Sequence, residues 1–177
     1  MHCKRGEGLT DVVLNAVVEI LEREGINAFL QFPERAADLK NGVFVCLSVD
    51  KCRSLSSGLG EYLGVLSGMG GKPDKELYGR RLELELGFEI FSPYGEGFGA
   101  TACLKCADKL KSLHMLFPSG IQALEFSYGE ISADDELAVF RCLCKLSCTA
   151  FLIAEGDGDE SIEFLDFVLK GTIKSAD

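Results

Sequence analysis

The stretch of sequence that decides the fold is GRRLELELGFEIFSPYGEGFGATACLKCADKLKSLHMLF, residues 79–117. Apolar and polar residues alternate from Leu82 to Ile90, which is the period of a strand with one buried and one solvated face. A glycine-rich turn follows at residues 93–99, and an amphipathic helix then runs to the residue before Pro118. Strands of a parallel sheet are usually apolar on both faces, so a half-solvated strand favours antiparallel pairing. The stretch therefore predicts an antiparallel sheet with a helix packed against it.

A second helix is predicted near the N-terminus, over residues 11–24. Its apolar residues recur at spacings of three and four and form one stripe: Leu9, Val12, Val13, Ala16, Val17, Ile20 and Leu21. The Thr10 hydroxyl is the expected N-cap. Gly25 is expected to end the helix in the left-handed conformation, with Ile26 packing back on Leu21.

Further strands are expected at residues 28–32, 43–51, 124–128, 137–153 and 163–173, with a turn at 132–135. The strand over 137–153 has a nearly unbroken apolar face at its even positions: Phe140, Cys142, Cys144, Leu146, Cys148, Ala150 and Leu152. At about 3.3 Å per residue it would be about 56 Å long, whereas a domain of this size is roughly 35–40 Å across. This strand must therefore bend, bulge or project. Residues 54–78 show little periodicity and are expected to form a long loop.

Strands joined by tight turns pair antiparallel, which indicates an α+β fold. We expect a mainly antiparallel sheet of five or six strands with two helices packed on one face. The length of 177 residues suits one compact domain, residues 1–177. The 28 acidic and 18 basic residues give a formal charge of −10, which disfavours binding to nucleic-acid phosphates. The N-terminal residues lack the apolar core of a signal peptide, so we expect a cytosolic protein whose eight cysteines are reduced.

The turn between strand and helix fits the dinucleotide-binding pattern G-x-G-x-x-[GA] through Gly95, Gly97 and Ala100. Glycines in this pattern let backbone amides approach a pyrophosphate at the N-terminus of a helix. The carboxylate of Glu96 would repel that phosphate, and the solvated face of the preceding strand does not suit a central parallel strand. The simpler interpretation is a flexible strand-to-helix turn. A small nucleotide- or ligand-binding module that uses residues 95–100 is kept as the alternative function.

Cysteines gather on two of the expected elements. Cys103 and Cys106 lie three apart on the helix, and Cys142, Cys144 and Cys148 share one face of a strand. Four converging thiolates bind zinc, but reduced cysteine is also a small hydrophobe suited to a helix–sheet interface. We expect the second arrangement, with the helix cysteines facing the strand cysteines in the core and no metal bound.

No residues form a convincing catalytic group. A Cys–His nucleophile needs hydrogen-bond contact, and His114 lies about 12 Å along the helix from Cys106. We therefore expect no enzymatic activity, no catalytic residue, no cofactor and no metal site.

Several short motifs accompany this order of elements. They are Glu22-Arg23-Glu24-Gly25-Ile26-Asn27, Phe32-Pro33, Leu39-Lys40-Asn41-Gly42 before Val43-Phe44-Val45, Tyr62-Leu63-Gly64, Tyr78-Gly79, Phe91-Ser92-Pro93 and Gly129-Glu130. Together they cover most of the chain, which in this respect resembles the tail-terminator (tail-completion) proteins of long-tailed bacteriophages and prophages.

The resemblance implies a structural protein without enzymatic activity. Such proteins form rings, usually hexamers, that cap the finished tail tube and face the head connector. The implied partners are further copies of this chain, the tail-tube protein and a head-completion or connector protein, with no cofactor, membrane or specific nucleic-acid binding. The implied location is the cytoplasm of the bacterial host during assembly and then the virion tail.

The apolar residues in the expected loop are candidates for subunit or partner contacts. We expect Leu59, Tyr62 and Leu63 to contact a neighbouring subunit or the tail tube, since such side chains are too apolar for a simple linker. The alternative is a local flap that covers the protein's own sheet.

Overall fold

The computed structural model describes residues 9–33, 42–56, 62–66, 75–117, 120–156 and 168–169. Its elements in chain order are α1 (Leu9–Arg23), β1 (Asn27–Phe29), β2 (Phe44–Ser56), β3 (Tyr62–Leu66), β4 (Lys75–Pro93), α2 (Ala100–Ser112), the 3-10 turn η2 (Leu113–Leu116), β5 (Ile121–Asp134), β6 (Val139–Gly156) and β7 (Val168–Leu169). The strands form one seven-stranded sheet in the order β1-β2-β4-β6-β5, with β3 added to β4 and β7 added to β6. Only β1 and β2 pair parallel among these, and the other pairs are antiparallel.

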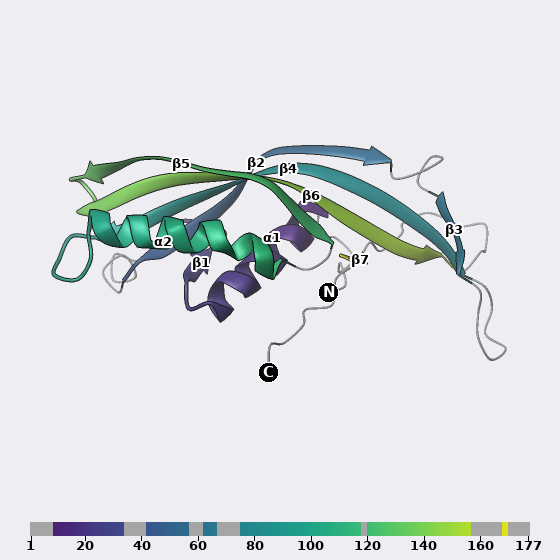
Figure 1. Cartoon of the computed structure of the whole chain (residues 1–177), viewed down its shortest axis with the longest axis horizontal. Helices are drawn as coiled ribbons and strands as arrows, with labels where there is room; N and C mark the ends of the chain where they lie inside the picture. The colour runs from purple at the N-terminus through teal and green to yellow at the C-terminus, as the bar shows by residue number, and fades with distance from the viewer. Residues whose placement is uncertain are drawn as a thin grey trace.

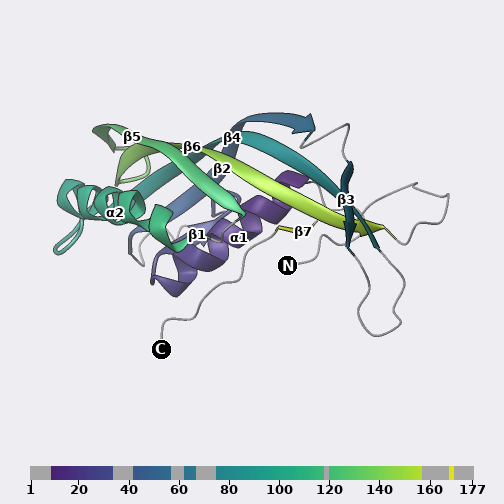
Figure 2. The ribbon, with the colours of Figure 1, turned by 45° about the vertical axis from the view of Figure 1, so that its right-hand side comes forward.

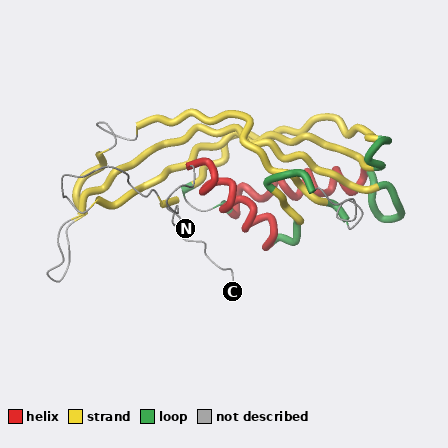
Figure 3. The backbone as a smooth tube through the Cα atoms, turned by 180° about the vertical axis from the view of Figure 1, so that it is seen from behind, coloured by secondary structure: helices red, strands yellow, loops and turns green. Residues whose placement is uncertain are grey.

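The sheet is long and curved, and both helices lie on the same side of it (Figures 1 and 3). Buried side chains of both helices share one hydrophobic core with the sheet. These observations confirm the expected α+β fold, a mainly antiparallel sheet with two helices on one face. We call the face beneath the helices the covered face, and the opposite face the open face.

Helix α1 packs on the sheet through the stripe that the sequence predicts. Its buried side chains are Val12, Val13, Ala16, Val17, Ile20 and Leu21. The Ile26 amide donates to the Leu21 carbonyl at 2.9 Å, and the Gly25 amide donates to the Glu22 carbonyl at 2.9 Å. With Gly25 at φ 70°, this is the expected left-handed helix end. The helix begins at Leu9, so Thr10 lies inside its first turn rather than at the N-cap.

The central pair of the sheet is formed by β4 and β6. Their pairing runs without interruption from Glu76 opposite Gly156 to Pro93 opposite Val139. Both strands curve and continue beyond the helices toward β3 (Figures 1 and 2). Curvature and projection together account for strands longer than the width of the domain, as the sequence predicts.

The two faces of this central pair differ in composition. On β4 the even positions from Leu82 to Ile90 are buried in the covered face. The charged residues Glu83, Glu85 and Glu89 alternate with them and are only half-buried. On β6 the even positions from Cys142 to Leu152 are buried opposite even positions of β4. The predicted alternation is confirmed on both strands.

Residues 54–78 differ from the expected long loop. Strand β2 continues to Ser56, β3 follows, and β4 begins at Lys75, so the described part of this segment is strand. Residues 57–61 and 67–74 of it lie outside the described residues. The end of β2 and the whole of β3 both pair with β4, with Ser56 opposite Arg80 and Leu66 opposite Lys75. Cross-strand pairing of this kind need not leave a local periodic signal.

Other boundaries also shift. Strand β1 ends at Phe29 rather than at residue 32, and β5 spans Ile121–Asp134 rather than 124–128. The turn before β6 lies at residues 135–138 instead of 132–135. Of the last expected strand, 163–173, only Val168–Leu169 is described, and it pairs with β6.

Candidate functional site

The cysteines lie where the sequence predicts, in the core between α2 and β6. Cys103, Cys106, Cys142 and Cys144 are all buried, and all belong to the same core cluster. The Cys103 thiol donates to the Phe140 carbonyl at 3.5 Å, so its polar atom is satisfied by the backbone of β6. Cysteine here fills the space of a small hydrophobe between helix and sheet.

Burial keeps these thiols protonated. It raises the pKa of Cys103 to about 11 and that of Cys106 to about 12, because a thiolate loses its hydration in the core. The pKa of Cys144 is raised further, first by burial and then by the neighbouring thiol of Cys142. A nucleophilic or redox cysteine needs a lowered pKa and access to solvent, and these four have neither.

Among the described residues, no group of three or more His, Cys, Asp or Glu side chains is arranged to hold a metal ion. All seven cysteines in the described ranges are free thiols.

The glycine-rich turn after β4 connects it to α2. Gly97 and Gly99 have φ of 85° and 89°, a region that favours glycine. The Gly99 amide donates to the buried Ser92 hydroxyl oxygen at 2.9 Å, and a Cβ on Gly99 would lie 3.5 Å from the Phe140 ring. The amide that a phosphate would need is therefore already bonded, and the backbone packs against an aromatic ring.

The strand before this turn is antiparallel to both of its central neighbours, β2 and β6. Dinucleotide-binding turns follow a parallel strand in a βαβ unit. Tyr94 further ties the turn to the β5–β6 connection: its hydroxyl donates to Asp135 Oδ1 at 2.8 Å, and its amide donates to the Ala138 carbonyl at 2.9 Å. This geometry favours a turn that seats α2 over one that binds a nucleotide.

Of the predicted contact residues, Tyr62 and Leu63 lie in β3, and Leu59 lies outside the described residues. The Leu63 side chain packs over the backbone of Gly79, where an added Cβ would come within 2.5 Å of it. The Tyr62 ring meets the Tyr78 ring edge-on at 5.8 Å. Both side chains are still about 40% exposed (41% and 40%), so β3 touches its own sheet and also presents apolar surface outward.

The open face carries paired charges. Arg141 forms ion pairs with Glu89 and, at 3.1 Å, with Asp134. Lys145 reaches Glu85 Oε1 at 2.9 Å and Asp50 Oδ2 at 3.4 Å. Glu85 also lines an open hollow of about 250 Å³, together with Lys51, Arg53 and Glu83. The acids and bases here neutralise each other on an exposed surface, as is usual on the solvated face of a sheet.

One end of the open face is aromatic instead. The Phe44 and Phe91 rings stack at 5.0 Å, and Phe32 packs edge-on against Phe91 at 5.0 Å. The Arg141 guanidinium lies 5.4 Å from the centre of the Phe91 ring. This small cluster is separate from the main core.

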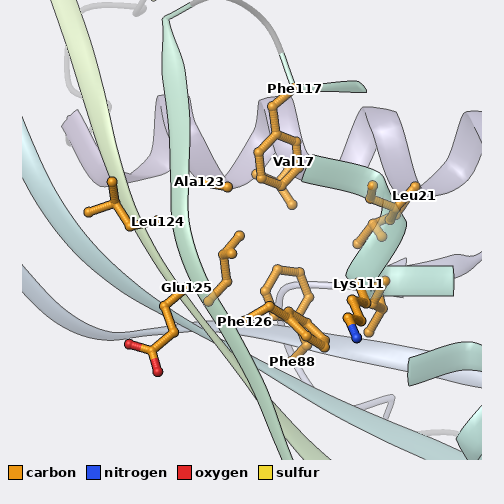
Figure 4. Close-up of a pocket in the computed structure, with 12 residues that line it drawn as sticks. Val17, Leu21, Phe88, Lys111, Phe117, Ala123, Leu124, Glu125 and Phe126 are labelled. Atoms are coloured by element: carbon orange, nitrogen blue, oxygen red, sulfur yellow. The ribbon is translucent and has the colours of Figure 1, made fainter. Parts of the chain in front are cut away.

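A partly open apolar cavity of about 300 Å³ lies beside β5 on the covered face (Figure 4). Helices α1 and α2 and strands β4, β5 and β6 contribute to its wall, including Val17, Leu21, Phe88, Phe117, Ala123 and Phe126. Lys111 and Glu125 are its charged lining residues, and the Glu125 carboxylate points away from its centre (Figure 4). The cavity does not include the glycine-rich turn, so the two features form separate regions.

The sheet has two long edges without a partner strand in the described part of the chain. One, the β5 edge, is the outer side of Ile121–Asp134. The other, the β2 edge, is the outer side of residues 47–56, because β1 pairs only with Phe44, Val45 and Cys46. Unpaired strand edges are templates for pairing with another chain. The two edges are the strongest candidate functional surfaces of this fold.

The sequence analysis identified neither edge. Which strands lie at the edges depends on the order of the strands in the sheet, and local sequence patterns do not report that order. It also shortened β5, where Ser127, Gly129 and Ser132 interrupt the apolar pattern and the register shifts between Tyr128 and Ile131. The alternation of Ile131 and Ala133 was a usable signal for a longer strand.

No family model matches this chain, and no curated protein matches it in sequence. None of the helices in the described ranges is long and apolar enough to span a membrane.

Proposed function

We propose that this protein is a non-enzymatic, ring-forming assembly subunit, a tail terminator of a phage or prophage that caps the tail tube and joins it to the head connector. The observation that carries the proposal is the sheet, which in the described part of the chain has two unpaired edges, the β5 edge and the β2 edge. A subunit whose sheet ends in such edges is suited to completion by neighbouring chains.

The chemistry of the described residues supports an assembly role over catalysis. The buried thiols have raised pKa values, Arg141 and Lys145 of the open face are paired with acids, and the Gly99 amide of the glycine-rich turn bonds to Ser92. The formal charge of −10 suits a ring through which DNA passes without adhering. Tyr62 and Leu63, with Leu59, stay proposed contacts to a neighbouring subunit or to the tube.

The test is assembly of the full chain. Sedimentation velocity and electron microscopy are carried out over a concentration series, alone and with tubes assembled from a candidate tail-tube protein of the same genome. We expect closed rings, either free or at the ends of tubes. A strict monomer that also ignores assembled tubes would rule the proposal out.

A further inference from the structure

We propose that copies of this chain join head to tail, with the β5 edge of one copy pairing with the β2 edge of the next. This inference rests on the proposed function, because it names the surfaces through which the subunits of the ring meet. The occupant of each edge is a second copy of this chain.

Strand directions fit this contact. Each step from β2 through β4 and β6 to β5 is antiparallel, so β5 runs opposite to β2. Copies related by rotation about an axis along the strands keep their strand directions, and their helices stay on one side. The new β5–β2 pair is then antiparallel, like the rest of the sheet. Each copy uses each edge once, which is a heterologous contact that closes into a ring when the rotation allows it.

The pairing register places Lys51 of β2 and Glu125 of β5, which carry opposite charges, in the same cross-strand row of the sheet. Lys51 on β2 lies opposite Glu85, Glu85 lies opposite Ser147, and Ser147 lies opposite Glu125 on β5. When a second copy continues this row without stagger, its Lys51 falls directly beside Glu125 of the first copy. Both side chains are exposed, and a directly opposed pair of opposite charge stabilises strand pairing.

The charges of the two edges disfavour a symmetric contact, in which the β5 edges of two copies pair with each other. Strand β5 carries Glu125, Glu130 and Asp134 and no basic residue, whereas the β2 edge carries Lys51 and Arg53 with Asp50. Two β5 edges paired with each other would bring together only acids, which is destabilising. The β5–β2 pairing brings an acidic edge to one with excess basic charge.

Apolar surface lies at the same level. Leu124 and Tyr128 on β5 are 63% and 46% exposed, and the 300 Å³ cavity lies alongside on the covered face. On β2, Val49 and Cys52 lie opposite the buried Leu86 and Leu84 and so belong to the covered side. An added β2 would bring these two side chains beside the cavity, so pairing would bury apolar surface as well as backbone groups.

The experiment exchanges the two charges. Glu125→Lys and Lys51→Glu are each made in the full chain, and Glu136→Lys, in the β5–β6 turn away from both edges, is the matched control. Assembly is measured by sedimentation velocity, alone and with tail tubes, and the melting temperature checks folding. Glu125→Gln and Lys51→Gln are milder substitutes in case a charge reversal prevents folding.

We expect each charge reversal to weaken subunit association about tenfold per contact, with no effect of the control. Mixing the two reversed variants should restore assembly. In the mixture, the lysine that replaces Glu125 in one variant meets the glutamate that replaces Lys51 in the other, and the two native residues meet at the alternate contact.

The other outcomes separate this inference from the proposed function. Single variants that assemble like the wild type would overturn the edge pairing and leave the proposed function intact. If a charge-reversed variant still forms rings but no longer binds tubes, the edge contacts the tube protein instead of a second copy. That result would also overturn the β5–β2 pairing between copies. A wild-type chain that never assembles, even on tubes, would remove both proposals.

Discussion

The covered and open faces of the β4–β6 pair share one backbone but differ in what their side chains do. The covered face holds buried aliphatic residues and protonated thiols packed against two helices. The open face holds half-exposed acids and bases that pair across strands. Burial of apolar surface dominates folding, whereas exposed ion pairs contribute little. The comparison indicates that the covered face holds the subunit together, and that the open face and the edges are available for other chains.

The largest effect should come from the covered face. Leu86 lies in the middle of β4, is fully buried, and is opposite Leu146 of β6. Leu86→Ala should lower the free energy of unfolding by about 2–5 kcal/mol, through lost burial and the cavity left behind. The control is Glu83→Ala on the open face of the same strand, which should cost less than about 1 kcal/mol. Urea unfolding of both variants measures the difference, and equal losses would refute the contrast between the faces.

Cys144 tests whether the thiols act as core hydrophobes. Cys144→Ser should lower the free energy of unfolding by about 1–3 kcal/mol, because a hydroxyl is buried where a weakly polar thiol was. Cys52→Ser, at an exposed position of β2, should change stability by less than about 0.5 kcal/mol. The denaturant midpoints of the two variants measure these changes in stability. A stable Cys144→Ser variant that has lost a stoichiometric metal would show instead that the cysteine is a ligand.

The raised pKa of a buried thiol predicts that the stability of the fold decreases at alkaline pH. In the folded state the pKa of Cys106 is about 12, against an ordinary value of 9.0. The unfolded state therefore loses its thiol proton first as the pH rises, and unfolding becomes more favourable. The contribution is complete below about pH 9 and is lost as the pH approaches 12. Melting temperature followed through this range should fall less steeply in Cys106→Ala than in the wild type, and identical slopes would contradict the burial of this thiol.

These examples show which parts of the structure could be read from the sequence. The helix α1, its glycine end and the buried faces of β4 and β6 follow from local periodicity, because neighbours in sequence report the same environment. The position of the cysteines followed for the same reason. The far end of β2, the strand β3 and the position of the two edges depend on how the strands pair, which local pattern does not report. The extension of β5 beyond Tyr128 depends on pairing with its hairpin partner β6 across a register shift. Local pattern therefore predicted the covered face well and said little about the edges, where the candidate site lies.

A smaller effect is expected at the start of α2, which seats that helix on the covered face. Gly99 has φ 89° and ψ −159°, a conformation nearly restricted to glycine. Gly99→Ala should lower the free energy of unfolding by about 1–2 kcal/mol through backbone strain, since the added Cβ would meet Phe140 only at ordinary contact distance. Gly129→Ala is the matched control, since its Cβ would also meet only ordinary contact, at 3.7 Å, and its φ is not positive. If Gly99→Ala is neutral while loss of nucleotide affinity is seen, the turn binds a ligand after all.

The smallest effect belongs to the open face itself. Lys145 pairs with both Glu85 and Asp50, and its side chain is 45% exposed. Water and salt screen such pairs, so Lys145→Met should change the free energy of unfolding only slightly at low salt, and less than any of the variants above. Repeating the urea titration at about 1 M salt, where the screening length falls to about 3 Å, should remove most of that difference. Arg53→Met is the control, because its nearest acid, Glu83, is 3.9 Å away and its side chain is 68% exposed. A large, salt-resistant loss at Lys145 would mean that the open face stabilises the subunit as the covered face does, and the division of roles between the two faces would fail.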